Sequence, residues 1–229
     1  MRQIVLDTET TGIGPELGHK IIEIGCVELI DRKLTGNHFH MYLNPQREVE
    51  EAAFKVHGIS TQFLQDKPLF GDIAHEFVQF IQESELIIHN APFDVGFLNA
   101  ELTFAKWPKK IEQHCKIFDT LVYAREKHPG QRNSLDALCK RYEVDNSNRE
   151  LHGALLDAEI LAKVYLAMTG GQGSLFAEEV SMKKEDKISV TISLSSTSPV
   201  ILAQEEELVK HQEFVDYIVK KSGVNYWEM

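Results

Sequence analysis

The chain has 229 residues, of which 43% are hydrophobic, and a formal net charge of −11 at pH 7. This length is enough for one ordinary domain with a tail or a small second domain, and the composition is that of a globular protein with a real core. The sequence contains no run of 18 apolar residues and passes directly into a predicted strand, so we expect neither a membrane span nor a signal peptide. The three cysteines lack CxxC spacing and indicate buried, reduced thiols, as in a cytoplasmic protein.

The acidic charge is unusual for a protein that binds nucleic acid. Most such proteins carry a basic excess, because cationic side chains release counterions from the phosphates. Two explanations remain open at this point. The protein does not touch nucleic acid, or it binds it weakly while a partner holds it, since tethering replaces affinity with effective concentration.

Apolar runs and periodicities predict an alternation of strands and helices. In chain order they predict strands at 3–7, 20–30 and 38–43, helices at 50–56 and 73–81, a buried strand at 86–89, a helix at 93–104, a strand at 115–118, and helices at 135–142 and 152–168. A turn is expected at 34–37, and Ser134 is a candidate N-cap. Hairpin-connected strands followed by alternating strands and helices predict an α/β fold with a mixed five-stranded sheet flanked by helices.

The character of the chain changes after Gly171. We expect a catalytic domain over residues 1–171, a linker over 172–204, and a docking helix and tail over 205–229. The linker contains a candidate strand at 188–194. The final segment combines an amphipathic helical pattern with Tyr226 and Trp227, which are large side chains that seldom stay exposed without a partner.

Two acids stand at the end of the first predicted strand. Side chains along a strand alternate between its faces, so Asp7 and Glu9 point to the same side. Two carboxylates that close repel each other unless a cation neutralises them, and hard oxygen ligands of this kind hold Mg²⁺ or Mn²⁺. We expect Asp94 and Asp157 to join them from two later helices.

Four acids and one histidine predict a metal-dependent phosphodiesterase. In two-metal hydrolysis the cations lie about 3.5–4 Å apart, so at least one carboxylate bridges them, and Asp7 is the candidate. Glu9 and Asp157 would complete one metal site, and Asp94 would help to hold the other, partly through water. His152 is the candidate general base. Because it lies five residues before Asp157, we expect it on the loop that enters the helix and not on the same helical face.

Other uses of these residues fit less well. An EF-hand loop that began at Asp7 would have glycine at its sixth position, as required, but Gly18 stands where the twelfth-position glutamate is needed. The sequence contains no GxxxxGK[ST] phosphate loop, no cysteine and histidine cluster with zinc spacing, and no GxSxG nucleophile elbow.

Three segments resemble the exonuclease motifs of the DEDDh family: LDTETTG at 6–12, HNAPFD at 89–94 and HGALLD at 152–157. Three more are similar to the proofreading subunits of bacterial replicative DNA polymerases: GHKIIEIG at 18–25, VHGI at 56–59 and NSLDALCKRY at 133–142. The resemblance covers nearly all of residues 2–172. It implies an RNase H-like fold, removal of nucleotides in the 3′→5′ direction, and two Mg²⁺ or Mn²⁺ ions.

The resemblance also implies roles for individual residues. It implies that the metal ligands are Asp7, Glu9, Asp94 and Asp157 and that His152 is the base. The implied contacts to the terminal nucleotide are made by Asp7, Glu9, His57 and Asp157. Some relatives carry an acid five positions before the histidine that corresponds to His57. Ala52 stands there in this chain, with Glu50 and Glu51 beside it, which puts a local sugar contact in doubt.

Two parts of the tail resemble docking segments of such proofreading subunits. Gln172, Leu175 and Phe176 resemble the pentapeptide that docks bacterial polymerase partners onto the sliding clamp, with Leu and Phe filling an apolar groove. The terminal helix and Trp227 are similar to the segment that binds the polymerase (alpha) subunit. A small third core subunit is a further candidate partner.

The leading hypothesis is therefore a proofreading exonuclease held in a replicase, acting on a DNA primer 3′ end. It accounts for the acidic charge, because the partners hold the DNA. A catalytically idle adaptor between polymerase and clamp is a second hypothesis, which the complete set of acids and His152 disfavours. A third keeps the chemistry but makes RNA ends the substrate.

Overall fold

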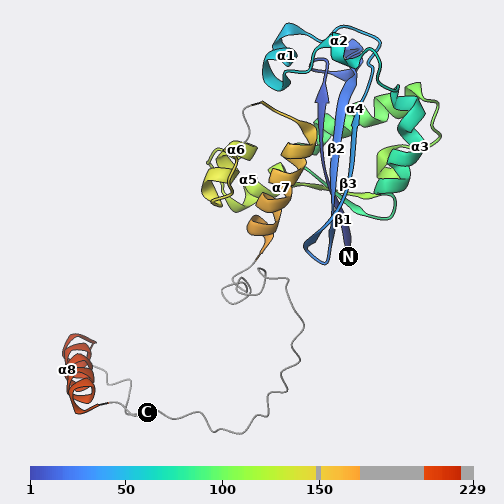
Figure 1. Ribbon diagram of the computed structural model, residues 1–229. Coiled ribbons are helices and arrows are strands. Elements are labelled where there is room, and N and C mark those ends of the chain that lie inside the picture. Colours follow the sequence, from blue (N-terminus) through green and yellow to red (C-terminus); the bar gives the residue numbers. More distant parts are fainter. Residues whose placement is uncertain (148–150, 171–203, 223–229) are drawn as a thin grey trace, which may run out of the picture. The chain divides into compact units, whose positions relative to one another are not determined.

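The computed structural model describes residues 1–147, 151–170 and 204–222. The chain divides into two units, Met1–Val180 and Ser181–Met229, and each is described by itself. In the larger unit, a five-stranded sheet lies between two layers of helices (Figure 1). Its strands are β1 (Arg2–Thr10), β2 (Ile21–Ile30), β3 (Lys33–Tyr42), β4 (Glu85–Ile88) and β5 (Lys116–Asp119). The α-helices described in this unit are α1 (Glu51–His57), α2 (Thr61–Leu64), α3 (Phe70–Ile81), α4 (Ala91–Phe104), α5 (Thr120–Lys127), α6 (Leu135–Arg141) and α7 (Ala154–Thr169).

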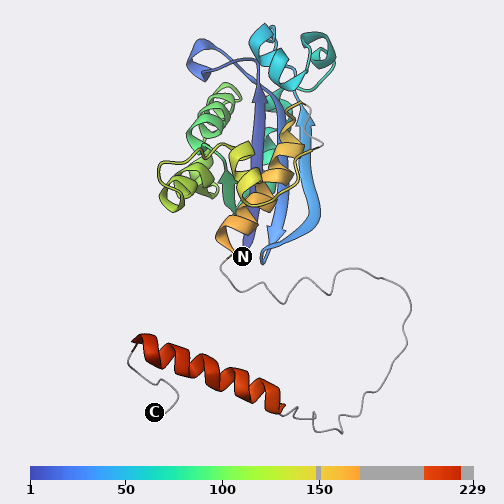
Figure 2. The same ribbon diagram turned by 90° about the vertical axis from the view of Figure 1, so that its left-hand side faces the viewer.

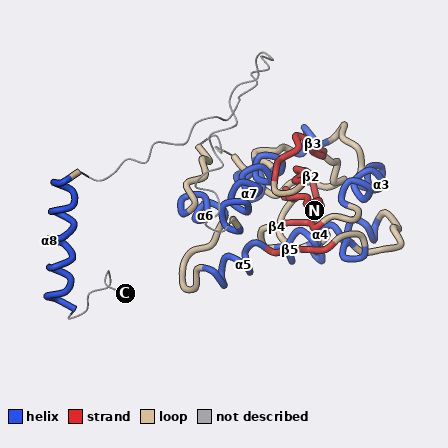
Figure 3. The backbone as a smooth tube through the Cα atoms, turned by 90° about the horizontal axis from the view of Figure 1, so that it is seen from below, coloured by secondary structure: helices blue, strands red, loops and turns tan. Residues whose placement is uncertain are grey.

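The strand order is β3-β2-β1-β4-β5, which Figure 3 shows from below. The first three strands form an antiparallel meander, and β4 and β5 add to it in parallel with β1. This mixed sheet confirms the predicted class. β1 is the central strand, and its carboxyl end lies beside the carboxyl end of β4, so a residue there can meet the start of α4, which follows β4.

The two layers of helices cover opposite faces of the sheet (Figures 1 and 2). Alternate residues of β1 enter two different cores. Ile4 and Leu6 belong to the core under α3 and α4, whereas Val5 belongs to the core under α5, α6 and α7. The period of two then continues along the strand and places Asp7 and Glu9 on the α7 face.

The turn between β2 and β3 differs from the prediction. It was expected at 34–37, but the chain reverses at Asp31 and Arg32, which both have positive φ (48° and 64°), and β3 begins at Lys33. Two consecutive residues with positive φ match the twist of a tight hairpin. Gly36, with φ 83°, lies inside β3 where the register between the strands shifts, so this glycine marks a bulge and not a turn.

The other predicted elements of this unit are confirmed, with boundaries that differ by a few residues. Ser134 caps α6 by accepting a hydrogen bond from the Ala137 amide at 3.4 Å. The short helices α2 and α5 were not predicted. α5 begins at a cap whose signal is a single acid, Asp119, which accepts hydrogen bonds from the Leu121 and Val122 amides. One capping residue without a clear apolar stripe is a weak sequence signal.

The described part of the smaller unit is α8 (Glu205–Ser222), which confirms the predicted helix. Four of its large side chains are more than half exposed: Leu208, Val209, Phe214 and Tyr217. The predicted features at 172–176, 188–194 and 226–227 lie outside the described residues. No described helix has the length and apolar composition to cross a bilayer. All three cysteines are buried free thiols.

Candidate active site

The α7 helix reaches the sheet beside Asp7 because a glycine leaves room for it. In the register of β1 and β2, Asp7 lies opposite Gly25, and Glu9 lies opposite Glu23. A Cβ atom at Gly25 would lie 2.2 Å from the carbonyl carbon of Ala154, in the first turn of α7. The backbone of α7 therefore rests directly on β2, and the residues of its first turn come level with the acids of β1.

Glu23 anchors this first turn. Its side chain is almost completely buried, and its Oε2 atom accepts a hydrogen bond from the Ala154 amide at 3.1 Å. Its Oε1 atom lies 2.7 Å from Nε2 of His40 on β3. A carboxylate at a helix N-terminus satisfies an amide that has no partner within the helix and interacts favourably with the helix dipole. Glu23 thus ties α7 to the sheet next to the candidate site.

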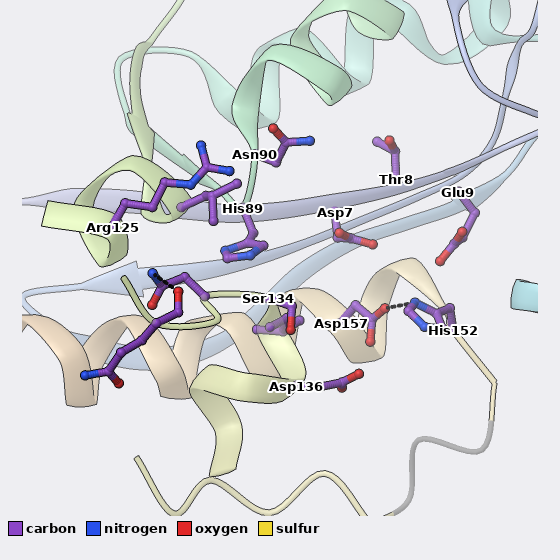
Figure 4. Close-up of a pocket in the computed structure, with 14 residues that line it drawn as sticks. Asp7, Thr8, Glu9, His89, Asn90, Arg125, Ser134, Asp136, His152 and Asp157 are labelled. Carbon is purple, nitrogen blue, oxygen red and sulfur yellow. Dashed lines mark hydrogen bonds and ion pairs between the residues drawn. The ribbon is translucent and has the colours of Figure 1, made fainter. Parts of the chain in front are cut away.

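A cavity of about 630 Å³ opens at this place (Figure 4). Its walls include Asp7, Thr8, Glu9, His89, Asn90, Leu121, Arg125, Gln131, Asn133, Ser134, Leu135, Asp136, His152 and Asp157. Asp157 is 2% exposed, and its Oδ2 atom lies 3.2 Å from Nδ1 of His152. Glu9, His152 and Asp157 each offer a ligand atom within 4.8 Å of the others. Segments far apart in the sequence thus converge here.

His152 lies on the loop before α7, as its spacing from Asp157 predicted. Its backbone amide donates a hydrogen bond to the carbonyl oxygen of Val56 at 3.1 Å. A Cβ atom at Gly58 would lie 2.7 Å from Cδ1 of Leu151, so the side chain of Leu151 lies close over that glycine. The C-terminal end of α1 therefore positions the loop, while the imidazole itself stays 43% exposed.

Asp94 is placed differently from the other acids. It lies in the first turn of α4, is 3% exposed and does not line the cavity. Its Oδ1 atom accepts a hydrogen bond from the Thr8 hydroxyl at 2.6 Å. Burial raises the pKa of Asp94 to about 7, and the bond from Thr8 opposes this rise. The structure thus groups three acids with His152 and holds Asp94 against Thr8.

Three supports of the site were not predicted from the sequence, namely Thr8, Glu23 and Asp119. Asp119 accepts hydrogen bonds from the amides of Asn90 and Ala91 as well as from the first turn of α5, so one carboxylate joins the starts of α4 and α5. Asn90 adopts φ 67° at this junction. The signal for Thr8 was its place between two acids on a strand, which puts it on the opposite face.

A second, smaller hollow of about 330 Å³ lies on the other side of Glu9. Its walls are mostly apolar and include Ala52, Val56 and His57. Nδ1 of His57 accepts a hydrogen bond from the Ile59 amide. Its buried Nε2 atom meets no described residue in good hydrogen-bond geometry, although the Thr10 backbone lies near enough to favour the protonated ring. The pKa of His57 is lowered, chiefly by burial.

The donor atoms of the cavity fit a divalent cation. Carboxylate oxygens are the ligands that Mg²⁺ and Mn²⁺ prefer, and Glu9 and Asp157 lie within ligand distance of each other. Both carboxylates are largely buried, and such a pair is costly unless a cation balances it. The predicted clamp residues Gln172, Leu175 and Phe176 lie outside the described residues.

Comparisons with known proteins agree with this geometry. Residues 4–165 match the model of an exonuclease family, so the chain belongs to that family. Exonuclease X in complex with a 5′-overhanging DNA duplex superimposes with a TM-score of 0.57 at 28% identity, over 72% of this chain and 90% of that one. The nuclease domain of 3′hExo, a DEDDh family member bound to rAMP, gives a TM-score of 0.63 at 19% identity, over 73% and 90%. The fold is RNase H-like, and DEDDh enzymes generally use divalent metal ions.

The similarity to one group of relatives extends over nearly the whole chain. DNA polymerase III subunit epsilon of Salmonella typhimurium is 54% identical over an alignment of 235 positions, which covers 99% of this chain and 97% of that protein. The same subunit of Escherichia coli is 53% identical with the same coverage, and that of Rickettsia prowazekii is 51% identical over 96% and 97%. The chain belongs to the family of DNA polymerase III epsilon subunits, which are proofreading 3′→5′ exonucleases.

Proposed function

We propose that the cavity between β1 and α7 hydrolyses the last phosphodiester bond of a mispaired DNA primer 3′ end. One observation supports this most strongly: Glu9, His152 and Asp157 lie within 4.8 Å of one another, with Asp7 in the same cavity. This is a concentration of hard anionic ligands next to a titratable imidazole. It is the constellation expected for metal-assisted attack of water on a phosphodiester.

We propose that Asp7, Glu9, Asp94 and Asp157 would hold two Mg²⁺ or Mn²⁺ ions. When bound, such ions supply charge stabilisation for the phosphate and favour ionisation of water. The fold brings these acids together before any ion binds. Strand β1 presents Asp7 and Glu9 to one face, and the packing of α7 against Gly25 and Glu23 positions Asp157. Thr8 holds Asp94 in one orientation through its 2.6 Å hydrogen bond.

His152 is proposed to accept the proton of the attacking water. A general base must reach both the water and solvent, to which it passes the proton. His152 lines the cavity at 3.2 Å from Asp157, and its side chain stays 43% exposed to solvent. Its loop is fastened at Val56, so the imidazole is held over the cavity without being enclosed by it.

We assign the terminal nucleoside to the apolar hollow beside Glu9. Its apolar walls suit a base, and the buried Nε2 atom of His57 offers a hydrogen bond to a sugar or base oxygen. Ala52 lines this hollow where some relatives carry an acid. Glu50 lines it too, but its Oε1 atom is engaged at 3.2 Å by Nε2 of His19.

Substitution of Asp7 tests the site. Purified Asp7→Ala should lose metal-dependent release of mononucleotides from a mismatched primer by more than about 10³-fold, because removing one anchor of the constellation disables the whole. Its circular dichroism and unfolding midpoint should stay near wild type. Asp31→Ala, an exposed acid on the hairpin turn, is the matched control. An Asp7→Ala protein that removes nucleotides at the original rate would refute the site. If the wild-type protein digested matched RNA and DNA oligonucleotides at equal rates, the assignment of DNA as the substrate would be wrong.

We further propose that the protein associates with the DNA polymerase III core and that different segments of the chain have different roles. Residues 1–171 would form the nuclease, 172–204 the linker, and 205–229 the segment that binds the polymerase alpha subunit in the cytoplasm. The exposed apolar side chains of α8 support the last assignment. Gln172, Leu175 and Phe176 would bind the sliding clamp, and a small third core subunit is a further partner.

Truncation tests the assignment of the tail. A chain that ends at Gly171 should retain hydrolysis and lose co-elution with the polymerase subunit in size-exclusion chromatography. Replacing Leu175 and Phe176 with alanine in the full chain should weaken clamp binding alone. Co-elution of the truncated chain with polymerase would remove the proposed role of residues 205–229.

A further inference from the structure

Glu9 stands between two hollows of opposite character. The hollow that contains His57 has mostly apolar walls and a volume of about 330 Å³, whereas the main cavity is polar and about 630 Å³. If the terminal nucleoside occupies the apolar hollow, as proposed above, the scissile phosphate lies near Glu9. The remaining strand must then leave across the polar cavity, towards its far wall.

That far wall consists of α5, through Leu121 and Arg125, and of the loop that leads into α6. Four of the described residues that line the cavity are acids, namely Asp7, Glu9, Asp136 and Asp157. Among the described lining residues, Arg125 on α5 is the only arginine or lysine. Figure 4 places it at the opposite end of the cavity from His152, beside His89 and Asn90. The positively charged side chain of Arg125 therefore lies where the strand would leave the acidic part of the cavity.

The position of the Arg125 guanidinium is not explained by a contact with any residue that the structure describes. It makes no hydrogen bond or ion pair with a described residue, and its side chain is exposed. The two polar neighbours of Arg125 do not supply a positive charge of their own. Burial lowers the pKa of His89, which favours its neutral form. The Asn133 amide is already bonded to the carbonyl oxygens of His128 and Gln131 and to Arg141.

Arginine matches the chemistry of a phosphodiester. Its planar guanidinium donates two parallel hydrogen bonds to phosphate oxygens, and it remains charged at any working pH. The first turn of the helix that carries it is capped by Asp119, which accepts hydrogen bonds from the Leu121 and Val122 amides and also from the Ala91 amide at the start of α4. The position of Arg125 is thereby coupled to the element that carries Asp94.

We propose that Arg125 binds an internal phosphodiester of the single strand, upstream of the bond that is cut, so that the strand runs from the His57 hollow across Glu9 to α5. This inference rests on the proposed function. The site recognises backbone charge and carries no preference for base sequence. It gives an otherwise acidic surface one point of contact with the incoming strand.

The test compares two substrates in the full chain. One is a single-stranded oligothymidylate of eight nucleotides, and the other is the 4-nitrophenyl ester of thymidine 5′-monophosphate, which has no upstream phosphate. Arg125→Gln should raise the ratio of the oligonucleotide KM to the ester KM roughly fivefold. It should also lower the salt slope of oligonucleotide binding by about 0.7, the value for one phosphate contact on a single strand. Arg125→Lys should restore part of the ratio.

Arg132→Gln is the matched control, because it removes the same charge from an exposed residue that does not line the cavity. It should leave the KM ratio as in the wild type. An unchanged ratio in Arg125→Gln, or an equal rise in Arg132→Gln, would overturn the inference while wild-type hydrolysis upholds the proposed function. If the wild type cleaved neither substrate, the proposed function would fall and this inference with it.

Discussion

The helices α4 and α7 place an aspartate in the same way and use it differently. Each carries the acid in its first turn, and both Asp94 and Asp157 are at most 3% exposed. Asp157 faces a cavity and a histidine, at 3.2 Å from Nδ1 of His152. Asp94 faces a threonine, at 2.6 Å from the Thr8 hydroxyl. Two similar local sequences thus end in an open and a closed environment.

The difference originates in β1 and in how each helix is seated. Alternation along the strand sends Asp7 and Glu9 to the α7 face and Thr8 to the α4 face. On the α7 face, Gly25 lets the helix backbone approach the sheet. On the α4 face, the hydroxyl of Thr8 donates a hydrogen bond to the carboxylate of Asp94. One central strand therefore carries two proposed metal ligands on one side and a support for a third proposed ligand, Asp94, on the other.

The largest effect is expected from a side chain at Gly25, where the backbone of α7 packs directly against β2. Gly25→Ala would place a methyl group against the backbone of Ala154, and neither backbone can yield without moving α7. We expect a loss of about 3 kcal/mol in the free energy of unfolding and a loss of nearly all hydrolysis. Urea denaturation and primer digestion measure the two effects.

The matched control for this change is Gly96→Ala inside α4, where the new Cβ would meet only Cγ of Pro15 at 3.9 Å. Alanine should stabilise that helix by up to about 1 kcal/mol. A Gly25→Ala protein as stable and active as Gly96→Ala would contradict the account of the seat.

The next effect concerns the open acid and its histidine. His152→Gln should lower kcat by about 10²- to 10⁴-fold, the usual contribution of a general base. The free energy of unfolding should change by less than about 0.5 kcal/mol, because the side chain is 43% exposed. Added imidazole should restore part of the rate.

His38→Gln, on the exposed part of β3, should change neither quantity. Calorimetry with Mn²⁺ separates a base from a metal ligand, because His152 lies within ligand distance of Glu9 and Asp157. A weakened Mn²⁺ affinity in His152→Gln would make it a ligand and would contradict its role as base.

A smaller effect is expected from the pH dependence of the closed acid. The pKa of Asp94 is raised to about 7 in the folded chain, so the folded state binds more protons than the unfolded state between about pH 4 and pH 7. Without metal, stability should therefore be highest below this window and fall as pH rises through it. Each unit of pKa shift corresponds to about 1.4 kcal/mol, so the fall should be a few kcal/mol at most.

Thermal unfolding in chelator at pH 4.5 to 8 measures this slope. Asp94→Asn should flatten it, whereas Asp66→Asn, at an exposed acid, should leave it unchanged. Identical slopes in wild type and Asp94→Asn would show that burial does not raise the pKa of this carboxyl group.

The smallest effect concerns the support of Asp94. Thr8→Val removes the hydroxyl that donates to its carboxylate, and a buried acceptor that loses its donor costs about 1–2 kcal/mol. We expect this loss of stability at pH 8 together with a decrease of about tenfold in hydrolysis. Thr8→Ser keeps the hydroxyl and should retain most of both, so equal losses in the two variants would deny the role of the hydrogen bond.

Sequence patterns predicted the class of fold and the main elements well. Apolar periodicity located all five strands and the long helices, since burial of one face imposes it directly. It misplaced the turn before β3, because Asp31 and Arg32 are not typical residues for positive φ, and the glycine at 36 suggested the wrong place. The helix α5 was not predicted, because its start depends on one capping acid, Asp119.

The sequence by itself determined which chemistry is available: Asp7 and Glu9 on one side of a strand, a loop histidine before Asp157, and motifs of an exonuclease family. Alternation and spacing are local properties, and local properties can be derived from order along the chain. Only the tertiary structure decided that Asp157 is open and Asp94 closed, that Gly25 and Glu23 seat α7, and that Arg125 faces the acids across the cavity. Those outcomes depend on contacts between residues far apart in sequence, which no single segment specifies.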